Sequence, residues 1–350
     1  MSIDWLRNTQ PMRPPDSGRR TLQVEVENWP LRMPFRISGS TVQNLDVVVV
    51  TLLQHGHSGR GEAAGVDYRK DDDVPTMMRQ IETLRPSIEA GSDRGTLQRL
   101  LPAGGARNAL DCALWDLQAK QCGRAAWQIA ELSEPQPLLT TYSLGANDPA
   151  AMAAGARAFA SAQAIKIKLT GEAVDAERVR AVREARPDVW LGIDANQGFT
   201  CAHFKELLPV LADARVELVE QPFPVGHEPM LDELKSPIPI AADESAQGLL
   251  DLPGLVGRFD VINIKLDKCG GLTEALLMAR EARRLGFGAM VGNMIGTSLA
   301  MAPAFLVGQL CGVVDLDGPV LLRTDRLPGA VYAHGRIWCD EKIWGGCAGR

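Results

Sequence analysis

The run AIKIKL at residues 164–169 places two lysines inside a short apolar segment. Residues i and i+2 of a strand point to the same side, so Lys166 and Lys168 share one face and the isoleucines and Leu169 occupy the other. Two ammonium groups so close together disfavour each other's charge, and partial burial adds to this effect. The run therefore predicts a lysine that can act as a base near neutral pH. Pairing of both lysines with carboxylates is the structural alternative.

From about residue 138 to residue 318, short β-type runs of this kind alternate with amphipathic helical stretches. Successive strand ends are 22 to 28 residues apart, which fits one strand, one helix and two short loops. Eight such units predict a closed (β/α)8 barrel of the TIM type, an α/β fold whose active site lies at the C-terminal ends of the strands. A doubly wound open sheet is the competing fold, but no glycine-rich phosphate loop follows an early strand. The polar residue at each strand end is, in order, Ser143, Lys168, Asp194, Glu220, Asp243, Lys265, Asn293 and Asp315.

The part of the chain before the barrel has a different pattern. Residues 21–28 and 45–54 alternate or run apolar as strands do, and helical patterns follow, the last ending at Gly123. This pattern predicts an α+β module over about residues 20–125. The Pro- and Arg-rich residues 1–20 are expected to form a flexible extension.

Composition narrows the classes of protein that the chain can belong to. Of 350 residues, 45% are hydrophobic and 23% charged, which is typical of a globular protein, and the net charge is −6. The chain has no basic stripe interleaved with aromatic residues, which argues against a nucleic acid partner. It has no apolar run long enough to cross a bilayer, which argues against a membrane partner. Its N-terminus shows no apolar region typical of a secretory signal. Seven scattered cysteines without a C-x-x-C pair indicate reduced thiols. We expect a cytoplasmic protein that acts on a small molecule, and a homo-oligomer stays open.

Three carboxylates, Asp194, Glu220 and Asp243, stand at the ends of successive strands. A single strand-end acid more often caps a helix or pairs with an arginine, but three at one depth of a barrel would repel one another without a cation. Hard oxygen ligands that converge from different strands suit Mg²⁺. Asn196, two residues after Asp194 and on the same face, is expected to support the ligand set.

Lys265, in NIKLDKCGG, ends the sixth predicted barrel strand and is nearly opposite the second, which carries Lys168. A substrate held on the cation between them would have one lysine on each side. This geometry suits abstraction of an α-proton from one face and return of a proton to the other, with the cation stabilising an enediolate. Lys268 is expected in a loop, facing solvent or a helix end.

Six motifs in register identify the chain as resembling the enolase superfamily, muconate lactonizing enzyme subgroup, over nearly its whole length after residue 20. The dipeptide epimerases are the members that it resembles most, through LPAGGARNALDCALWDL (101–117), NIKLDKCGGLTEAL (263–276) and the D-x-D of VDLDGP. The six motifs that carry the resemblance to the superfamily are AIKIKL, GIDANQ, ELVEQP, AADES, NIKLDKCGG and VGNM.

The resemblance implies an α+β capping domain (21–125), a modified barrel (126–320) and a C-terminal tail (321–350) that returns to the cap. It also implies one Mg²⁺ on the three acids, acid/base roles for Lys168 and Lys265, and tuning of Lys168 by Lys166. Asp315 and Asp317 would hold the free α-ammonium of a dipeptide whose C-terminal residue is inverted at Cα. Asn293 and Arg36 are further candidates for substrate binding.

The side chain of the substrate depends on the first loop of the cap. The family's Ala-Glu epimerases use a basic residue in the first cap loop, and Arg36 is the only cation in the corresponding stretch PFRISGSTVQN (34–44). Epimerisation of L-Ala-D/L-Glu, tied to recycling of peptidoglycan peptides, is the default expectation, and a more apolar dipeptide is the alternative.

Other activities compete with this hypothesis. Within the fold they are N-acylamino acid racemase, o-succinylbenzoate synthase and cycloisomerase, which need no D-x-D for an ammonium group. A Schiff-base aldolase would use a strand-end lysine of lowered pKa on a carbonyl. A non-catalytic binding protein would have no need for two lysines and three acids.

Overall fold

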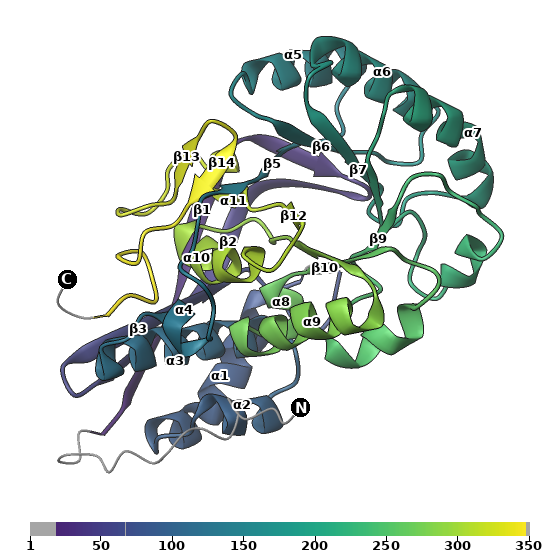
Figure 1. The fold of residues 1–350 in the computed structure, drawn as a ribbon. Helices are drawn as coiled ribbons and strands as arrows, with labels where there is room; N and C mark the ends of the chain where they lie inside the picture. Colours follow the sequence, from purple (N-terminus) through teal and green to yellow (C-terminus); the bar gives the residue numbers. More distant parts are fainter. Residues whose placement is uncertain (1–18, 67, 348–350) are drawn as a thin grey trace.

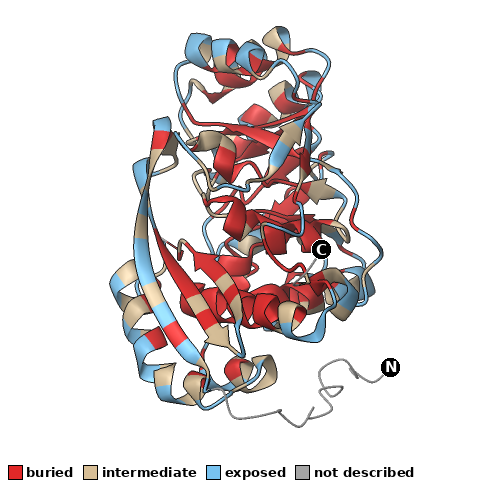
Figure 2. Cartoon of the chain, turned by 90° about the vertical axis from the view of Figure 1, so that its left-hand side faces the viewer, coloured by how far each residue is buried: buried red, intermediate tan, exposed pale blue. Residues whose placement is uncertain are grey.

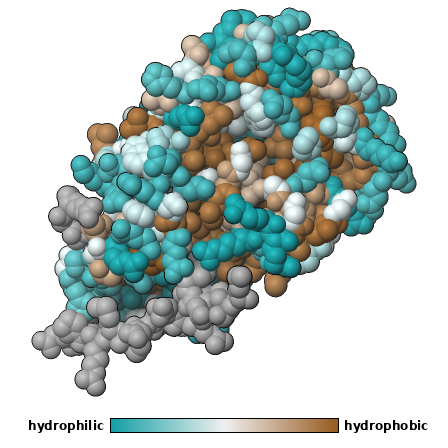
Figure 3. Space-filling view, viewed as in Figure 1, coloured by the Kyte–Doolittle hydropathy of each residue, from teal (hydrophilic) through white to brown (hydrophobic). Residues whose placement is uncertain are grey.

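The computed structural model describes residues 19–66 and 68–347, and Figure 1 shows a ring of strands and helices beside an N-terminal lobe. Most of the expected flexible extension, residues 1–18, lies outside the described residues. Buried residues fill the centre of the ring, and exposed ones lie along its outer helices (Figure 2). The outward surfaces of those helices are mainly hydrophilic on the face shown in Figure 3.

The N-terminal lobe is an antiparallel sheet in the order β1-β2-β3, packed against three helices. The sequence predicted its first two strands, but both are longer than expected because the β1–β2 hairpin continues past a register shift between Pro30 and Phe35. Its elements are β1 (Thr21–Ile37), β2 (Ser40–Gln54), β3 (His57–Ala63), α1 (Val74–Glu89), α2 (Arg94–Leu100) and α3 (Gly105–Cys122).

Helix α3 packs very closely on β3 and is buried along most of its length. Two glycines of β3 permit this approach: a Cβ atom at Gly59 would lie 2.3 Å from the carbonyl oxygen of Ala113. A Cβ atom at Gly61 would lie 2.1 Å from that of Ala109. On its other side α3 contacts the barrel, where the Trp115 indole donates to Thr273 Oγ1 at 2.9 Å. The helix therefore joins the lobe to the ring of strands.

Eight parallel strands form a nearly closed barrel, as the sequence predicted. Each pairs with the next in chain order, from β5 to β12. The strands are β5 (Thr141–Leu144), β6 (Ala164–Lys168), β7 (Trp190–Asp194), β8 (Leu218–Glu220), β9 (Ile240–Ala242), β10 (Val261–Ile264), β11 (Gly288–Val291) and β12 (Val313–Val314).

Helices connect these strands around the outside, although the connections after β8 and β9 carry short 3-10 helices. Within the described residues, no helix combines the length and apolar character needed to cross a membrane. The helices are α5 (Pro149–Ala158), α6 (Asp175–Ala185), α7 (Cys201–Asp213), η2 (Glu228–Leu231), η3 (Leu249–Leu255), α8 (Leu266–Cys269), α9 (Leu272–Leu285) and α10 (Ser298–Gly308).

The ring closes at a seam between β5 and β12, its first and last strands. The backbone ladder of the described residues does not include this pair. Side chains bridge the seam instead: Leu316 N donates to Thr140 Oγ1 at 3.0 Å, and the Thr141 hydroxyl donates to Asp315. A residue expected at the site thus also helps to close the barrel.

The C-terminal tail runs back to the N-terminal lobe. Arg326 contacts two of its carboxylates, Glu27 at 2.6 Å and Glu62 at 2.8 Å. Glu62 also accepts from Thr297 N at 2.7 Å, so one buried carboxylate links lobe, tail and barrel. The remaining elements are α4 (Ala126–Ile129), β4 (Leu138–Leu139), α11 (Gly318–Leu321), β13 (Val331–Ala333) and β14 (Arg336–Trp338), with β13-β14-β4 forming a small antiparallel sheet.

The close approach of α3 to β3 makes Gly61 sensitive to a single added methyl group. We expect Gly61→Ala to lower the free energy of unfolding by about 1–3 kcal/mol, because the Cβ atom meets backbone that cannot move without shifting α3. Thermal denaturation measures the change. Gly254→Ala is the matched control, because an added Cβ atom meets nothing within 4 Å there. Equal melting temperatures for the two variants would contradict this account of the packing.

Candidate active site

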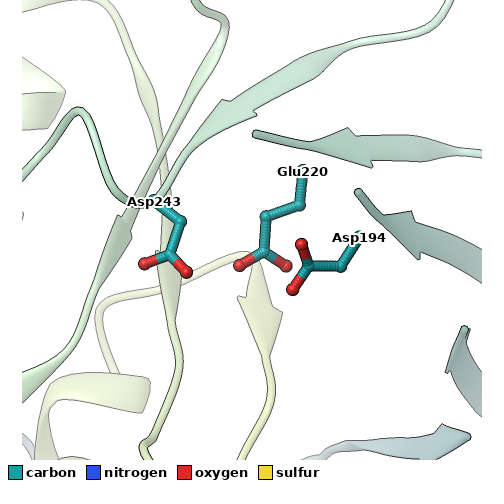
Figure 4. A group of neighbouring side chains, drawn as sticks. All are labelled: Asp194, Glu220 and Asp243. Atoms are coloured by element: carbon teal, nitrogen blue, oxygen red, sulfur yellow. The ribbon is translucent and has the colours of Figure 1, made fainter. Parts of the chain in front are cut away.

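Three carboxylates from neighbouring strands point toward one another inside the barrel mouth (Figure 4). Asp194 and Glu220 end β7 and β8, and Asp243 directly follows β9. Their ligand oxygens lie within 4.8 Å of one another, and all three residues are buried. The structure therefore brings together the three acids that the strand spacing singled out.

Oxygen atoms without partners surround this acid cluster. Within the described residues, Glu244 Oε2 and Asn196 Oδ1 are buried and accept no hydrogen bond. Asn196 contacts the cluster, since its backbone N–H donates to Asp194 Oδ1 at 2.8 Å, and its support of a metal ligand set stays a prediction. Mg²⁺ takes carboxylate oxygens and keeps several waters, which need acceptors of this kind. The residues present therefore fit a magnesium ion.

The electrostatics of the cluster point the same way. Burial, followed by the negative charge of Asp194, raises the pKa of Glu220 to about 7. Burial, followed by the charge of Asp243, raises the pKa of Glu244 to about 8. Burial also acts on Asp243, but the ammonium groups of Lys265 and Lys268 outweigh it and lower the pKa of that carboxyl. The negative charges of Glu220 and Glu244 are thus not fully compensated by neighbouring positive charge.

A charge count over the barrel mouth gives the size of the shortage. Six carboxyl groups and four lysines lie buried there and interact with one another, so full ionisation leaves two uncompensated negative charges. A divalent cation supplies the matching charge. The groups are Asp194, Glu220, Asp243, Glu244, Asp315, Asp317, Lys166, Lys168, Lys265 and Lys268.

Lys166 and Lys168 share the interior face of β6, as the alternation of the strand predicted. Lys168 Nζ donates to Asp194 Oδ2 at 2.6 Å. Lys166 Nζ lies 2.8 Å from Glu220 Oε2 and 2.5 Å from Asp315 Oδ2. The alternative in which both lysines pair with carboxylates is therefore the arrangement present.

This pairing corrects one expectation for Lys166. Burial alone would lower its pKa, but the carboxylates of Asp315, Glu220 and Asp194 outweigh burial and raise the pKa well above its ordinary value. The sequence argument counted the neighbouring lysine and missed the three acids, which come from other strands. Lys166 is a charged group that neutralises carboxylates, whereas Lys168 reaches the cavity described next.

Lys168 and Lys265 line the same cavity of about 600 Å³ between barrel and lobe. Lys265 Nζ lies 2.7 Å from Asp243 Oδ2, so each lysine holds one of the two outer acids of the cluster. Burial would lower the pKa of Lys265, but the charges of Asp243 and Glu220 raise it. Asn196 and Asn293 line this cavity as well.

The D-x-D of the sequence lies at the seam, and both aspartates are buried. Asp315 is held by Lys166 and Thr141, and Asp317 Oδ2 accepts from Ser143 N at 2.6 Å. Burial, followed by the charge of Asp315, raises the pKa of Asp317 to about 6. Neither aspartate is among the residues that line the cavity, and their contact with substrate stays a prediction.

Arg36 does not lie where the resemblance suggested. Its neighbours Phe35 and Ile37 line the cavity, and alternation along β1 turns Arg36 to the other side. There it lies 3.1 Å from Glu172 Oε1, and both side chains are roughly half exposed. Asn293 does line the cavity, and it donates to the carbonyl oxygen of Asp315 at 2.6 Å.

The sequence analysis missed two further residues of the cluster. Lys268, expected in a loop, is fully buried, and its Nζ atom lies 2.5 Å from Asp243 Oδ1. Lys268 lies in the short helix α8, which begins directly after Lys265, and the turn of this helix brings its side chain back toward Asp243. Asn263 Nδ2 donates to Glu220 Oε1 at 2.6 Å. Its position two residues before Lys265, on the same strand face, could have indicated this contact.

Tyr68 is a third addition, and it comes from the loop after β3. It lines the cavity, and its hydroxyl accepts from Gln247 Nε2 at 3.2 Å. Gln247 Nε2 also donates to the carbonyl oxygen of Glu244 at 2.6 Å. No sequence pattern marks this pairing, because it depends on how the lobe lies over the barrel.

Comparison with known proteins extends these observations. The family model "Mandelate racemase / muconate lactonizing enzyme, N-terminal domain" matches residues 19–130, and "Enolase C-terminal domain-like" matches residues 150–337. The chain is 39% identical over 320 residues to the L-Ala-D/L-Glu epimerase of Escherichia coli K12, covering 91% of this chain and 99% of that one. It is 40% identical over 290 residues to an N-acetyl-D-glutamate racemase of Pseudoalteromonas, covering 82% and 91%.

Solved structures show the same architecture. An enolase family member from Agrobacterium tumefaciens, with sodium and L-Ala-L-Glu bound, superposes with a TM-score of 0.90 at 43% identity, covering 93% of this chain and all of that one. A dipeptide epimerase from Enterococcus faecalis, in complex with Mg and L-Leu-L-Tyr, gives a TM-score of 0.82 at 28% identity, covering 91% and 94%.

The raised pKa of Glu220 predicts that magnesium binding depends on pH. Below its pKa of about 7 the metal-free protein holds a proton on this group, which the cation must displace. We expect the association constant for Mg²⁺ to rise by up to about tenfold per pH unit below pH ~7 and to level off above it. Isothermal titration calorimetry in two buffers of different ionisation enthalpy measures affinity and proton release together.

Matched variants separate this effect from general electrostatics. Glu220→Gln should abolish tight binding, whereas Glu217→Gln, at an exposed position three residues earlier, should leave it unchanged. An affinity that stays constant across this pH range would rule out Glu220 as a proton-bearing ligand.

Proposed function

The chain belongs to the mandelate racemase / muconate lactonizing enzyme family of the enolase superfamily, and from that premise we propose that it is a magnesium-dependent dipeptide epimerase. It inverts the α-carbon of the C-terminal residue of its substrate. One observation carries the proposal: Lys168 and Lys265 line one cavity from β6 and β10, and the acid-bearing strands lie between them. Epimerisation needs such an arrangement, since a proton leaves one face of the α-carbon and arrives at the other.

In this proposal the two lysines exchange roles between the two epimers. One lysine removes the α-proton, and the ammonium group of the other protonates the opposite face. Mg²⁺ on Asp194, Glu220 and Asp243 would supply positive charge to the substrate carboxylate and so acidify the adjacent C–H bond. Lys166 stays charged and helps to balance the acids, which fits its contacts with Glu220 and Asp315.

The carboxylates couple the charge of the lysines to the cation site. Asp194 and Asp243 hold the ammonium groups of Lys168 and Lys265 at 2.6 and 2.7 Å. The same carboxylates would hold the cation, and its positive charge would weaken their hold on the lysine protons. A lysine that loses this partner gives up its proton more readily, as a base requires.

We assign the free α-ammonium of the dipeptide to Asp315 and Asp317. The support is chemical: two buried carboxyl groups at i and i+2, one of them with a raised pKa, favour an added cation. Asn293, which binds the backbone of Asp315 and lines the cavity, would orient the same end of the substrate.

N-acylamino acid racemisation is the second candidate, favoured by the relative named N-acetyl-D-glutamate racemase. It would use the same lysines and cation. An N-acyl group carries no ammonium, however, and would give Asp315 and Asp317 no cationic group of the substrate to bind. Faster deuterium exchange into N-acetyl-glutamate than into any L-Ala dipeptide would favour this candidate over the first.

The biological setting is also a proposal. The reduced, scattered cysteines favour the cytoplasm. There the enzyme would act on dipeptides released by peptide turnover, of which peptidoglycan recycling is one source. Contacts between barrel helices would support a homo-oligomer, which light scattering of the purified protein can establish.

Replacement of either lysine tests the two-base scheme. We expect Lys168→Ala and Lys265→Ala each to lower kcat for epimerisation of both diastereomers by at least about 10³-fold, because each direction needs both residues. The change in optical rotation, or NMR of the two diastereomers, measures the rate. Lys205→Ala, at an exposed lysine of α7, is the control. Full activity of Lys265→Ala would exclude a second base.

Removal of the cation distinguishes the proposal from a Schiff-base enzyme. Treatment with EDTA should abolish activity, and added Mg²⁺ should restore it, because the substrate carboxylate then regains its counter-charge. Borohydride with substrate should leave the protein mass unchanged. A mass increase on Lys168 or Lys265 after borohydride, with activity that survives EDTA, would instead identify an aldolase.

A further inference from the structure

The geometry of the site leaves one direction for the substrate side chain. An α-carbon carries four groups, and the proposed function gives a direction to three of them. The proton faces the lysines and the carboxylate faces the acid cluster. The amide nitrogen leads, through the N-terminal residue, to the ammonium group assigned to Asp315 and Asp317. The fourth, the side chain, faces the remaining wall of the cavity, which the β1–β2 hairpin and the loop after β11 provide. Its apolar members are Phe35, Ile37, Val42, Met294 and Ile295.

The cations near this wall are already engaged. Arg36 is turned away toward Glu172, as described above. Arg69, in the loop after β3, donates to Gln247 and to the carbonyl oxygens of Lys268 and Ala103, and it lies 3.7 Å from Asp72. Apart from the two lysines of the proton transfer, no cationic residue is among those that line the cavity in the described chain.

The remaining charges on the lobe side of the cavity are negative. Asp72 and Asp73 both line it. Asp72 is buried, and its Oδ1 atom accepts from Gly105 N at 2.8 Å. Its Oδ2 atom lies 3.7 Å from Arg69 but accepts no hydrogen bond from the described residues, so its negative charge is only partly compensated. A carboxylate brought to this wall would lose water, gain no cation and face like charge.

We propose that the C-terminal residue of the preferred dipeptide has an uncharged, apolar side chain, and that glutamate is a poor substrate. This inference rests on the proposed function. The hairpin wall selects through contact area, and selection against glutamate comes from the missing cation.

A dipeptide panel tests the inference with the magnesium-loaded enzyme. In D₂O, NMR follows loss of the Cα–H signal for L-Ala-L-Met, L-Ala-L-Leu, L-Ala-L-Gln, L-Ala-L-Glu and L-Ala-L-Lys. We expect kcat/KM for Met and Leu to exceed that for Glu by at least about tenfold. Gln should also exceed Glu; these two side chains have the same shape, so their comparison isolates the charge.

Each other outcome overturns a defined statement. Glu equal to or better than Gln would overturn the inference and leave the proposed function intact. Lys better than Met and Leu would show that the aspartates, and not the apolar wall, set the preference. Exchange into none of the dipeptides would reject the proposed function itself.

A gain of charge on the wall provides the second arm. Ile37→Lys, near the tip of the β1–β2 hairpin, should raise the Glu-to-Gln ratio of kcat/KM by at least about tenfold, because it supplies the missing cation. Ile37→Met is the matched control, and its ratio should stay at the value of the parent enzyme. A ratio unchanged in the folded Ile37→Lys protein would overturn the placement of the side chain at this wall.

Discussion

The balance of charge inside the barrel mouth is the constraint on which the site depends. Six buried carboxyl groups face four buried lysines, and burial, followed by the negative charge of neighbouring carboxylates, raises the pKa values of Glu220 and Glu244. Buried charges are costly unless they are paired, so this deficit makes the site receptive to a divalent cation. The acids that would take the cation also hold Lys168 and Lys265. A cation bound by these acids would therefore compete with the two lysines for the same carboxylates.

The second requirement is a lobe held firmly over this mouth. Glycines on β3 let helix α3 pack closely on the sheet of the lobe, and Trp115 on α3 contacts the barrel at Thr273. Glu62 joins lobe, tail and barrel through Thr297 and Arg326. The cavity accordingly has two kinds of wall. The barrel carries the lysines and acids proposed for the reaction, and the hairpin carries apolar residues that would contact the variable part of a substrate. This division allows the selectivity to change without disturbance of the charge balance.

Much of this arrangement could be predicted from the sequence, because a parallel barrel converts regular spacing into position. One polar residue every 22 to 28 positions was enough to predict the barrel and to group Asp194, Glu220 and Asp243. The family resemblance is likewise confirmed. Contacts between side chains of different strands and loops could not be predicted from this spacing. The pKa of Lys166 depends on acids from three other strands. The pairing of Arg36 depends on Glu172, in the loop after β6. The burial of Lys268 depends on the four-residue helix α8 that follows Lys265.

The seam of the barrel has a mechanical consequence. Hydrogen bonds from side chains, and not a continuous ladder, join β5 to β12, and Asp315 serves both as a fastener of the ring and as the partner of Lys166. A separation of β5 from β12 would move Asp315 and so displace the Lys166 ammonium group, which neutralises Glu220. A ligand that bound Asp315 would therefore also act on the joint between β5 and β12.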